Sequence, residues 1–399
     1  MKHVTERIYD FNAGRIPAML NYKYHYMTKN LFRFYRATCH LFYEDLVQDN
    51  HLPNSPLGWI CGDMHLENFG SYKGSNGMVY FDLNDFDEAV LAPVAWEAVR
   101  LVTSILVAFE SLKIDNDKAM HMANLFLKSY AATLGKGKAC YIEASTARGI
   151  IKEFLETVGI RKQKSILAER TEKGKILLEH AKHLQLDRLS KKELLEHVGN
   201  WLKNDDGSPY NYEAVDAAFR LAGTSSLGIN RYEILLKSTN GNGKRYLLLD
   251  MKQAMPSSLT SYLPNKQPKF ANEGERIVFL QQLLQNQTPA LLSSTIYKGI
   301  PFIMHEMEPV KDSINFKLIK KNYRGMCEVI DSMGMLAASS QLRAAGRKGA
   351  ANADALVKFG LDCNWQESIL NYSLKAAAKT KKYFEAFKKD QEKIPLLND

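Results

Sequence analysis

The residues best suited to chemistry lie in two short stretches of the N-terminal half. Residues 61–70 read CGDMHLENFG and residues 79–89 read VYFDLNDFDEA. Phosphoryl transfer needs a carboxylate that orients the acceptor hydroxyl, and oxygen ligands that hold Mg²⁺ on the phosphates. An Asp and an Asn on one loop, with a second Asp at the end of a neighbouring strand, supply these groups. The spacing therefore predicts Asp63 as the orienting base and Asn68 and Asp85 as magnesium ligands.

Two other interpretations of these acids stay open. Asp and Asn are frequent in turns, so Asp82, Asp85 and Asp87 could form a solvated acidic patch. A different metal site, such as a calcium loop, is the second alternative, although the D-x-D-x-D-G spacing with a later Glu is absent. Asp82 and Asp87 alternate with apolar residues, and acids in such a setting usually bind a cation or serve a function. This favours the phosphotransfer site.

A candidate phosphate-binding loop follows in the middle of the chain, where residues 223–228 read GTSSLG between strand-like runs. Glycines allow close approach to phosphates, backbone N–H groups and hydroxyls can cover them, and Lys252 on a later strand would neutralise charge. The loop is not a P-loop, because no Gly-Lys-[ST] ends it. A plain β-hairpin is the alternative. The residues expected to bind the nucleotide are Gly223, Thr224, Ser225, Ser226, Gly228 and Lys252.

Together these motifs resemble known enzymes. G-D-x-H-x-x-N from Gly62, D-F-D-x-A from Asp85 and P-x-x-W-E-x-x-R-L from Pro93 resemble the catalytic core of aminoglycoside phosphotransferases and choline kinases. More closely, G-D-x-H-x-E-N-F-G with N-D-F-D-E resembles the bacterial domain-of-unknown-function family 2252, over most of the chain. Glu97 stands where the related enzymes usually have Asp, and Ser225 replaces a usual Gly.

The resemblance implies ATP and Mg²⁺ as cofactors and adds four expected site residues. His65 belongs to the catalytic loop, where a structural role competes with a catalytic one. Glu275, with Glu273 as the alternative, would hold the lysine from a helix, although either could be a stabilising first-turn acid. Met304 and Met307 would lie in the connection between lobes, whose backbone groups could meet adenine.

The order of elements predicts an α+β chain with a protein kinase-like, two-lobed and circularly permuted fold, because the glycine loop and lysine follow the catalytic loop instead of preceding it. A small antiparallel β lobe is expected beside a larger, mainly helical lobe. Residues 1–206 would form the first part of the helical lobe, residues 207–310 the nucleotide-binding β lobe with a hairpin signal at 240–243, and residues 311–399 the rest of the helical lobe.

Composition limits the partners, the cysteine chemistry and the cellular location that we expect. The net charge of +9 over 399 residues is spread along the chain, so no nucleic-acid partner is expected. The five cysteines are scattered and never spaced as C-x-x-C, which predicts neither a disulfide framework nor a zinc site. No long apolar run or secretory h-region occurs, so we expect a cytoplasmic protein without a membrane span.

These observations predict a Mg-ATP-dependent phosphotransferase that acts on an unidentified hydroxyl acceptor, either a small molecule or a protein. A nucleotidyltransferase using the same cleft and a non-catalytic pseudokinase or scaffold are the alternatives. Because Lys252 and Asp85 would act on the same phosphates, their charged ends should lie within roughly 10 Å across one cleft. Asp63 and Asn68 should line its floor, and residues 223–228 its roof.

Overall fold

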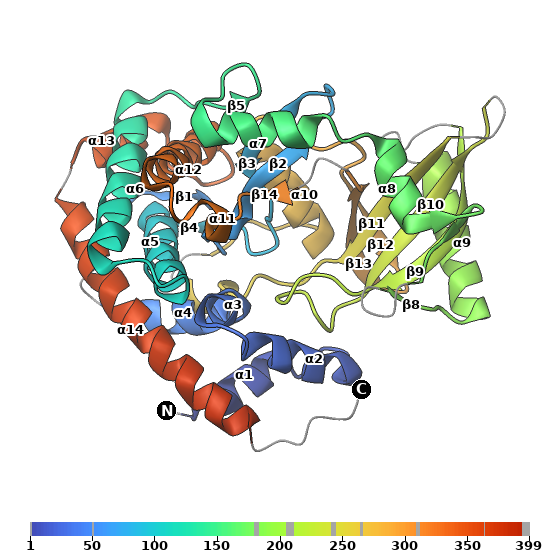
Figure 1. The fold of residues 1–399 in the computed structure, drawn as a ribbon, viewed down its shortest axis with the longest axis horizontal. Coiled ribbons are helices and arrows are strands. Elements are labelled where there is room, and N and C mark those ends of the chain that lie inside the picture. The colour runs from blue at the N-terminus through green and yellow to red at the C-terminus, as the bar shows by residue number, and fades with distance from the viewer. Residues whose placement is uncertain are drawn as a thin grey trace.

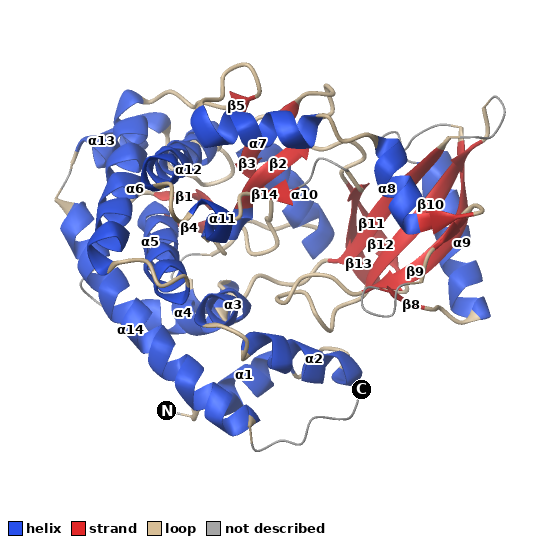
Figure 2. Ribbon diagram, viewed as in Figure 1, coloured by secondary structure: helices blue, strands red, loops and turns tan. Residues whose placement is uncertain are grey.

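The computed structural model describes residues 2–49, 52–178, 183–204, 211–240, 245–263, 266–308, 312–362 and 364–392. Helices gather on one side and a six-stranded antiparallel sheet on the other (Figures 1 and 2). This mixed α+β architecture with several antiparallel sheets confirms the predicted fold class at that level. Residues 241–243 of the predicted hairpin, and the predicted boundaries near 207 and 310, lie outside the described residues.

The helical part is built from the two ends of the chain around the buried helix α5 (Val94–Ser111), which follows Pro93 and is apolar along nearly its whole length. α14 packs against α5 and α12 packs against α6, so the C-terminal helices return to this part as predicted. The remaining helices here are α1 (Val4–Asn12), α2 (Pro17–Met27), α3 (Leu31–Ala37), α4 (Cys39–Leu46), α6 (Asn116–Lys136), α11 (Phe316–Ile319), α12 (Tyr323–Arg343), α13 (Ala353–Leu361) and α14 (Trp365–Gln391).

Two small antiparallel sheets carry the acidic stretches. β1 (Leu57–Ile60) pairs with β4 (Val90–Pro93). β2 (Phe69–Lys73) and β3 (Val79–Leu83) form the centre of a four-stranded sheet, with β14 (Asp312–Ser313) and β5 (Ile142–Glu143) at its edges. A short 3₁₀ turn, η1 (Leu66–Asn68), leads into β2. The loop after β1 and the loop after β3 therefore meet at one place.

The large sheet has the strand order β12-β13-β11-β10-β9-β8. Its strands are β8 (His183–Leu184), β9 (Tyr212–Arg220), β10 (Arg231–Ser238), β11 (Tyr246–Gln253), β12 (Ser293–Tyr297) and β13 (Ile300–Glu306), and α10 (Glu273–Leu284) lies between β11 and β12 in the chain. Side chains of β11 alternate between the two faces. Leu249 and Met251 join an apolar core with α9 (Arg188–Asn204), whereas Asp250 and Lys252 lie on the opposite face.

The β-rich part takes in more of the chain than the predicted boundary near 207 suggests. α9 packs on β9, and β8 extends the sheet at that edge. α8 (Gln163–Arg170) contacts β11 on the other face of the sheet. Between α8 and β8 runs the short hairpin β6 (Thr171–Glu172) and β7 (Lys175–Ile176), while α7 (Gly149–Gly159) contacts β3 and α12.

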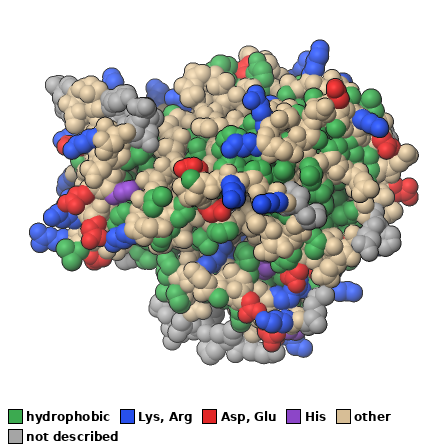
Figure 3. Space-filling view, turned by 180° about the vertical axis from the view of Figure 1, so that it is seen from behind, with side chains coloured by type: hydrophobic (Ala, Val, Ile, Leu, Met, Phe, Trp, Pro, Cys, Tyr) green, Lys and Arg blue, Asp and Glu red, His purple; other side chains and the backbone are tan. Residues whose placement is uncertain are grey.

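The exterior is mixed in charge. On the face drawn in Figure 3, Lys and Arg side chains are interspersed with Asp and Glu. No helix in the described part of the chain combines the length and apolar character needed to cross a membrane.

The close contact between α6 and α12 depends on Gly334. A Cβ at this position would lie 2.7 Å from the Phe126 carbonyl oxygen and 2.8 Å from the Ser129 Cβ, on a backbone that cannot move aside freely. We therefore expect Gly334→Ala to lower the free energy of unfolding by about 1–3 kcal/mol. Gly159→Ala is the matched control, because nothing lies within 4 Å of its position. Urea unfolding of both variants tests this, and an equal effect of the two would contradict it.

Candidate active site

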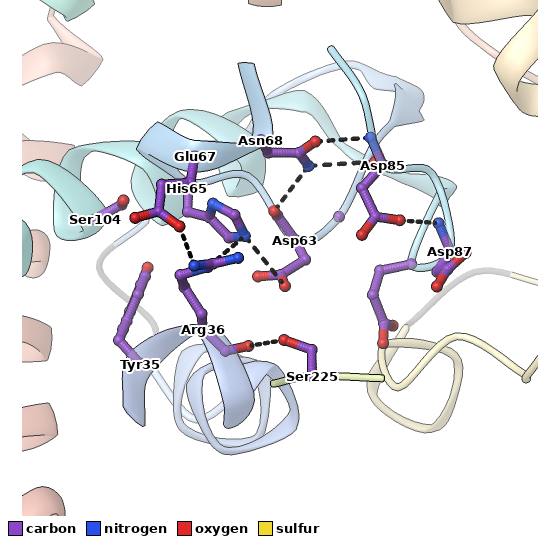
Figure 4. Close-up of polar contacts among 12 residues, drawn as sticks. Tyr35, Arg36, Asp63, His65, Glu67, Asn68, Asp85, Asp87, Ser104 and Ser225 are labelled. Atoms are coloured by element: carbon purple, nitrogen blue, oxygen red, sulfur yellow. Dashed lines mark hydrogen bonds and ion pairs between the residues drawn. The ribbon is translucent and has the colours of Figure 1, made fainter. Parts of the chain in front are cut away.

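The loop after β1 approaches the loop after β3 very closely, because Gly62 has no side chain. Its φ of +83° lies in the left-handed region, and a Cβ there would overlap the Glu88 carbonyl group. Glycine therefore permits both the backbone conformation and the contact. As a result, the loop that carries Asp63 lies beside the loop that carries Asp85 and Asp87 (Figure 4).

Asp63 is held by a buried arginine. Its Oδ1 accepts hydrogen bonds from Arg100 Nη2 at 2.7 Å and from Nε at 3.3 Å. The Arg100 side chain, on α5, is fully buried, donates to the Tyr35 carbonyl oxygen and lies 3.7 Å from the Tyr35 ring centroid. Because Oδ1 is fixed, Asp63 retains Oδ2 for another partner. Sequence reasoning did not assign this role to Arg100, although its place in the P-x-x-W-E-x-x-R-L motif was an available signal.

His65 stands behind Asp63 and supports the loop. Its Nε2 accepts a hydrogen bond from Arg36 Nε at 3.3 Å and lies 3.8 Å from Asp63 Oδ2 (Figure 4). Burial, together with the charges of Arg36 and Arg100, lowers the pKa of His65 well below its usual range. The ring is therefore neutral at pH 7, and with Nε2 accepting, its proton lies on Nδ1. This geometry favours the structural role over the catalytic one.

Asn68 cross-links the two acidic loops through its side-chain amide. Nδ2 donates to the carbonyl oxygens of Asp63 at 3.1 Å and Asp85 at 3.2 Å, and Oδ1 accepts from the backbone N–H groups of Asp85 at 2.8 Å and Asn84 at 3.3 Å. The residue is buried. Because both lone pairs of Oδ1 have partners, Asn68 would have to give up a backbone contact to bind the predicted metal.

Lys252 reaches the acidic loops from the large sheet. Its Nζ lies 3.9 Å from Asp85 Oδ1 and forms an ion pair with Asp87 Oδ2. The expected juxtaposition of Lys252 and Asp85 within roughly 10 Å is thus confirmed. Burial opposes the charge on Lys252, but Asp85 and Asp87 raise its pKa. Burial and the Asp85 carboxylate raise the pKa of Asp87, against the opposite effect of the ammonium group.

Two contacts missed by sequence reasoning fix the backbone around Asp87. Arg276 on α10 donates to the carbonyl oxygens of Asp87 at 2.8 Å and Ala89 at 2.6 Å. Glu88 accepts from the Ser258 backbone N–H at 2.6 Å, in the segment that follows β11. The sheet and its helix therefore position the acidic loop as well as the lysine.

The predicted phosphate loop lies over this site. Ser225 and Ser226 line a small cavity together with Asp63, Asp85 and Asp87, so Asp63 and this loop face one cleft as expected. Asn68, which was also expected in the floor, is buried and is not among the lining residues. Gly223 and Gly228 have φ of +73° and +88°, which explains the need for glycine at both turns. The volume of this cavity is only about 70 Å³.

The N-terminal helices hold the loop down by its carbonyl groups. Lys23 Nζ donates to the carbonyl oxygens of Thr224 at 3.1 Å and Ser225 at 2.8 Å, and Arg15 Nη1 donates to that of Ser225 at 2.7 Å. Lys23 is buried. The segment α1–α2 therefore closes the cleft from the outside.

Three predicted site residues lie elsewhere. Glu275 is exposed in the first turn of α10, where it contacts the N-cap residue Asn272, and the carboxylates that pair with Lys252 are Asp87 and Asp85 instead. The alternative, Glu273, pairs with Arg276. The prediction that either glutamate holds Lys252 is therefore wrong for this conformation, because the acidic loop reaches the ammonium group first.

Met304 and Met307 do not offer free backbone groups to a base. Met304 is fully buried in the core between the sheet and α9, and β13 pairs on both sides at this residue. The Met307 N–H donates to the Leu248 carbonyl oxygen at 2.8 Å, and its own carbonyl oxygen accepts from Gln163 at 3.4 Å. Strand pairing thus uses the groups that were expected to meet adenine.

The residues present fit a phosphate-bound cation better than a free one. Within the described residues no group of three or more His, Cys, Asp or Glu side chains is arranged to hold a metal. Asp85 is 55% exposed and points at the cleft beside Asp87. Mg²⁺ on a nucleotide is usually held by one or two carboxylates plus phosphates and waters, so this pair is a sufficient protein contribution.

Comparison with known proteins gives one result. A family described as an uncharacterized protein conserved in bacteria (DUF2252) matches residues 15–390. The chain belongs to this family. No curated protein and no solved structure matches it. The match spans both the acidic loops and the large sheet, so the acidic residues and the lysine of the cleft in this DUF2252 chain lie within the family region.

Glu97 supports the Asp63 loop from inside the DUF2252 core. Its Oε1 accepts from the Cys61 backbone N–H at 2.6 Å, and its Oε2 accepts from Gln341 Nε2 at 2.8 Å. Gln341 Oε1 in turn accepts from the Tyr130 hydroxyl at 2.5 Å. Burial raises the pKa of Glu97 to about 7, although these hydrogen bonds favour the carboxylate.

This pKa predicts a specific pH dependence. An acid with a folded pKa near 7 and an unfolded pKa near 4.5 stabilises the fold fully below about pH 4.5 and loses that contribution as the pH rises to about 7. As the pH rises from about 4.5 to about 7, we expect the unfolding free energy of the wild type to fall by about 3 kcal/mol more than that of Glu97→Gln, which has no carboxyl group to titrate at this position. The amide can replace the carboxyl if Gln341 flips. Urea unfolding at several pH values tests this, and parallel pH profiles would contradict it.

Proposed function

We propose that this DUF2252 chain is a Mg-ATP-dependent phosphotransferase that acts on a hydroxyl acceptor, small molecule or protein. The observation that carries the proposal is the ion pairing of Lys252 with Asp85 and Asp87, two acids that line a cleft together with Asp63. A lysine on a strand, a metal-binding Asp and an orienting Asp on a separate loop are the parts that kinase-like phosphoryl transfer requires.

The strand order supports a kinase-like and circularly permuted fold as part of the same proposal. A glycine-containing loop joins β9 to β10, Lys252 lies on β11, and α10 separates β11 from β12. This is the division of labour in protein kinases, in which the lysine is on the third strand and a helix follows it. The acidic loops precede this unit in the chain, which permutation explains.

Each residue then has a defined task. Mg-ATP would supply the phosphoryl group and neutralise charge on the phosphates. Asp85, with Asp87, would hold the cation, and Lys252 would bind phosphate oxygen once released from Asp87. Asp63, fixed through Oδ1 by Arg100, would orient the acceptor hydroxyl and take its proton at Oδ2. Asn68 and Glu97 would hold the two acidic loops at fixed positions relative to each other.

Nucleotide binding requires the cleft to open. A cavity of about 70 Å³ is well below the ~300 Å³ that small-molecule sites usually provide. The contacts that must break are those of Arg15 and Lys23 with the carbonyl groups of residues 224 and 225. Nucleotidyl transfer in the same cleft stays an alternative, and release of ADP versus AMP-modified acceptor separates the two. A pseudokinase would bind nucleotide without either product.

Asp63→Asn should abolish most turnover while nucleotide binding persists. The amide preserves shape and still offers an oxygen to Arg100, but it cannot accept the hydroxyl proton, so kcat should fall by about 10²–10⁴-fold. ADP release and nucleotide titration measure the two effects. Asp354→Asn is the matched control, because it makes the same chemical change at an exposed position in the first turn of α13. Turnover of Asp63→Asn near the wild-type rate would exclude Asp63 as the base.

Asp85→Ala should weaken nucleotide binding in magnesium more than binding in EDTA, because Asp85 is proposed to act through the cation. Calorimetric titration of ATP with and without Mg²⁺ gives both affinities. Asp82→Ala is not a suitable control, since Asp82 is buried and pairs with Arg343. Asp117→Ala, in the exposed first turn of α6, is suitable. Equal losses under the two conditions would indicate that Asp85 is a structural acid.

A further inference from the structure

A second, larger cavity lies on the face of the large sheet that carries Lys252. Its volume is about 560 Å³, and it is bounded by α8, by the strands β9, β10, β11 and β13, and by the connection after β13. Its charged and titratable lining comprises four arginines, one histidine and three acids: Arg161, Arg170, Arg220, Arg231, His305, Asp250, Glu169 and Glu308. None of these residues is part of the predicted site.

One buried carboxylate in this cavity holds two arginines. Arg231 donates to Asp250 through Nε, at 2.8 Å, and through Nη2. Arg220 Nη1 lies 3.0 Å from the same Asp250 carboxylate, whose side chain is only 1% exposed. His305 Nε2 lies 3.5 Å away from it. The acid therefore neutralises part of a larger cationic group.

A second carboxylate repeats the arrangement. Arg170 Nη1 lies 2.8 Å and His183 Nε2 3.1 Å from Glu233 Oε2, and Arg220 Nε lies 3.7 Å from it. Glu233 is fully buried, and its Oε1 has no hydrogen-bond partner. Three guanidinium groups thus share two buried carboxylates. Burial lowers the pKa of Arg220, and Arg231 and Arg170 lower it further against the opposing effect of Asp250.

This lining suits phosphate and does not suit an aromatic base. Sites for planar bases are mostly apolar, whereas the side chains that face this cavity from β10 and β11 are charged. Guanidinium groups match phosphate oxygens with two parallel hydrogen bonds, and several of them around one cavity favour a ligand with several negative charges.

The cavity also borders the catalytic cleft. Arg231 lies directly opposite Lys252 in the β10–β11 register, and Asp250 lies opposite Glu233 two pairs further along, on the same face. Directly paired residues of antiparallel strands share a face of the sheet. A chain of linked phosphates could therefore extend from Lys252 along the arginines.

We propose that this arginine-lined cavity binds an oligophosphate group, meaning two or more linked phosphates. The proposal does not depend on phosphoryl transfer by the neighbouring cleft. The phosphates could belong to the nucleotide donor, with its nucleoside outside the cavity, or to a phosphorylated acceptor. Both sources share the chemistry that Arg170, Arg220 and Arg231 recognise.

The test uses inorganic tripolyphosphate as the probe and the full chain at low ionic strength. Arg170→Gln and Arg231→Gln should each weaken binding about tenfold or more, because each removes a charge-assisted contact. Asp250→Asn should tighten binding, because it frees two arginines from their competitor. Glu233→Gln should do the same if Asp250→Asn does not fold. Arg324→Gln, on an exposed part of α12, is the matched control and should leave affinity unchanged.

The arginine variants should bind tripolyphosphate more weakly and the carboxylate variants should bind it more tightly. A general loss of structure would instead weaken binding in every variant. Absence of saturable binding by the wild type, or weaker binding by both carboxylate variants, would overturn the proposal and leave the charges as a structural network. Competition with ATP identifies the source. Displacement of tripolyphosphate by ATP assigns the cavity to the donor, and simultaneous binding assigns it to a second ligand. Tripolyphosphate binding without any ATP binding would remove the proposed function and retain this inference.

Discussion

The pairing of Lys252 with Asp85 and Asp87 is the contact on which the arrangement of this protein depends. It joins the large sheet to the loop after β3, which belongs to a different sheet and a distant part of the chain. The lysine is almost fully buried and would be costly to bury without an acidic partner. Arg276 donates hydrogen bonds to two backbone carbonyl groups of the same loop. The large sheet and the loop after β3 are therefore fixed to each other at the point where the proposed chemistry occurs.

Rigid support surrounds this contact on the helical side. Arg100 fixes Asp63, Asn68 ties its loop to the loop of Asp85, and Glu97 holds the backbone just before Gly62. These three residues are buried and bonded to protein groups, so they hold the loops that carry Asp63 and Asp85 in place. Catalytic groups need such support because small displacements of a reacting group cost large factors in rate.

The sheet side combines a narrow cleft with a roomy, cationic cavity. The cleft is closed by Arg15 and Lys23, which bind carbonyl groups of the loop above it. The cavity beside it is several times larger and lined by arginines paired to Asp250 and Glu233. A ligand with several phosphates would compete with Asp250 and Glu233 for the guanidinium groups of Arg170, Arg220 and Arg231. Binding of such an anion would also relieve the repulsion among the arginines.

The sequence by itself determined the acidic loops, the glycine turns and several of the strands along the chain, because these depend on local spacing and on residues with few alternatives, such as Gly62 and Gly228. It also predicted that Lys252 and Asp85 would meet. Only the tertiary structure decided which carboxylate pairs with Lys252, and for that reason Glu275 was assigned wrongly. It also decided which backbone groups are already hydrogen-bonded, and for that reason Met307 was assigned wrongly. The arginine cavity is invisible in sequence because its lining comes from five separate helices and strands, and charge pairing across strands depends on register and burial that no local pattern encodes.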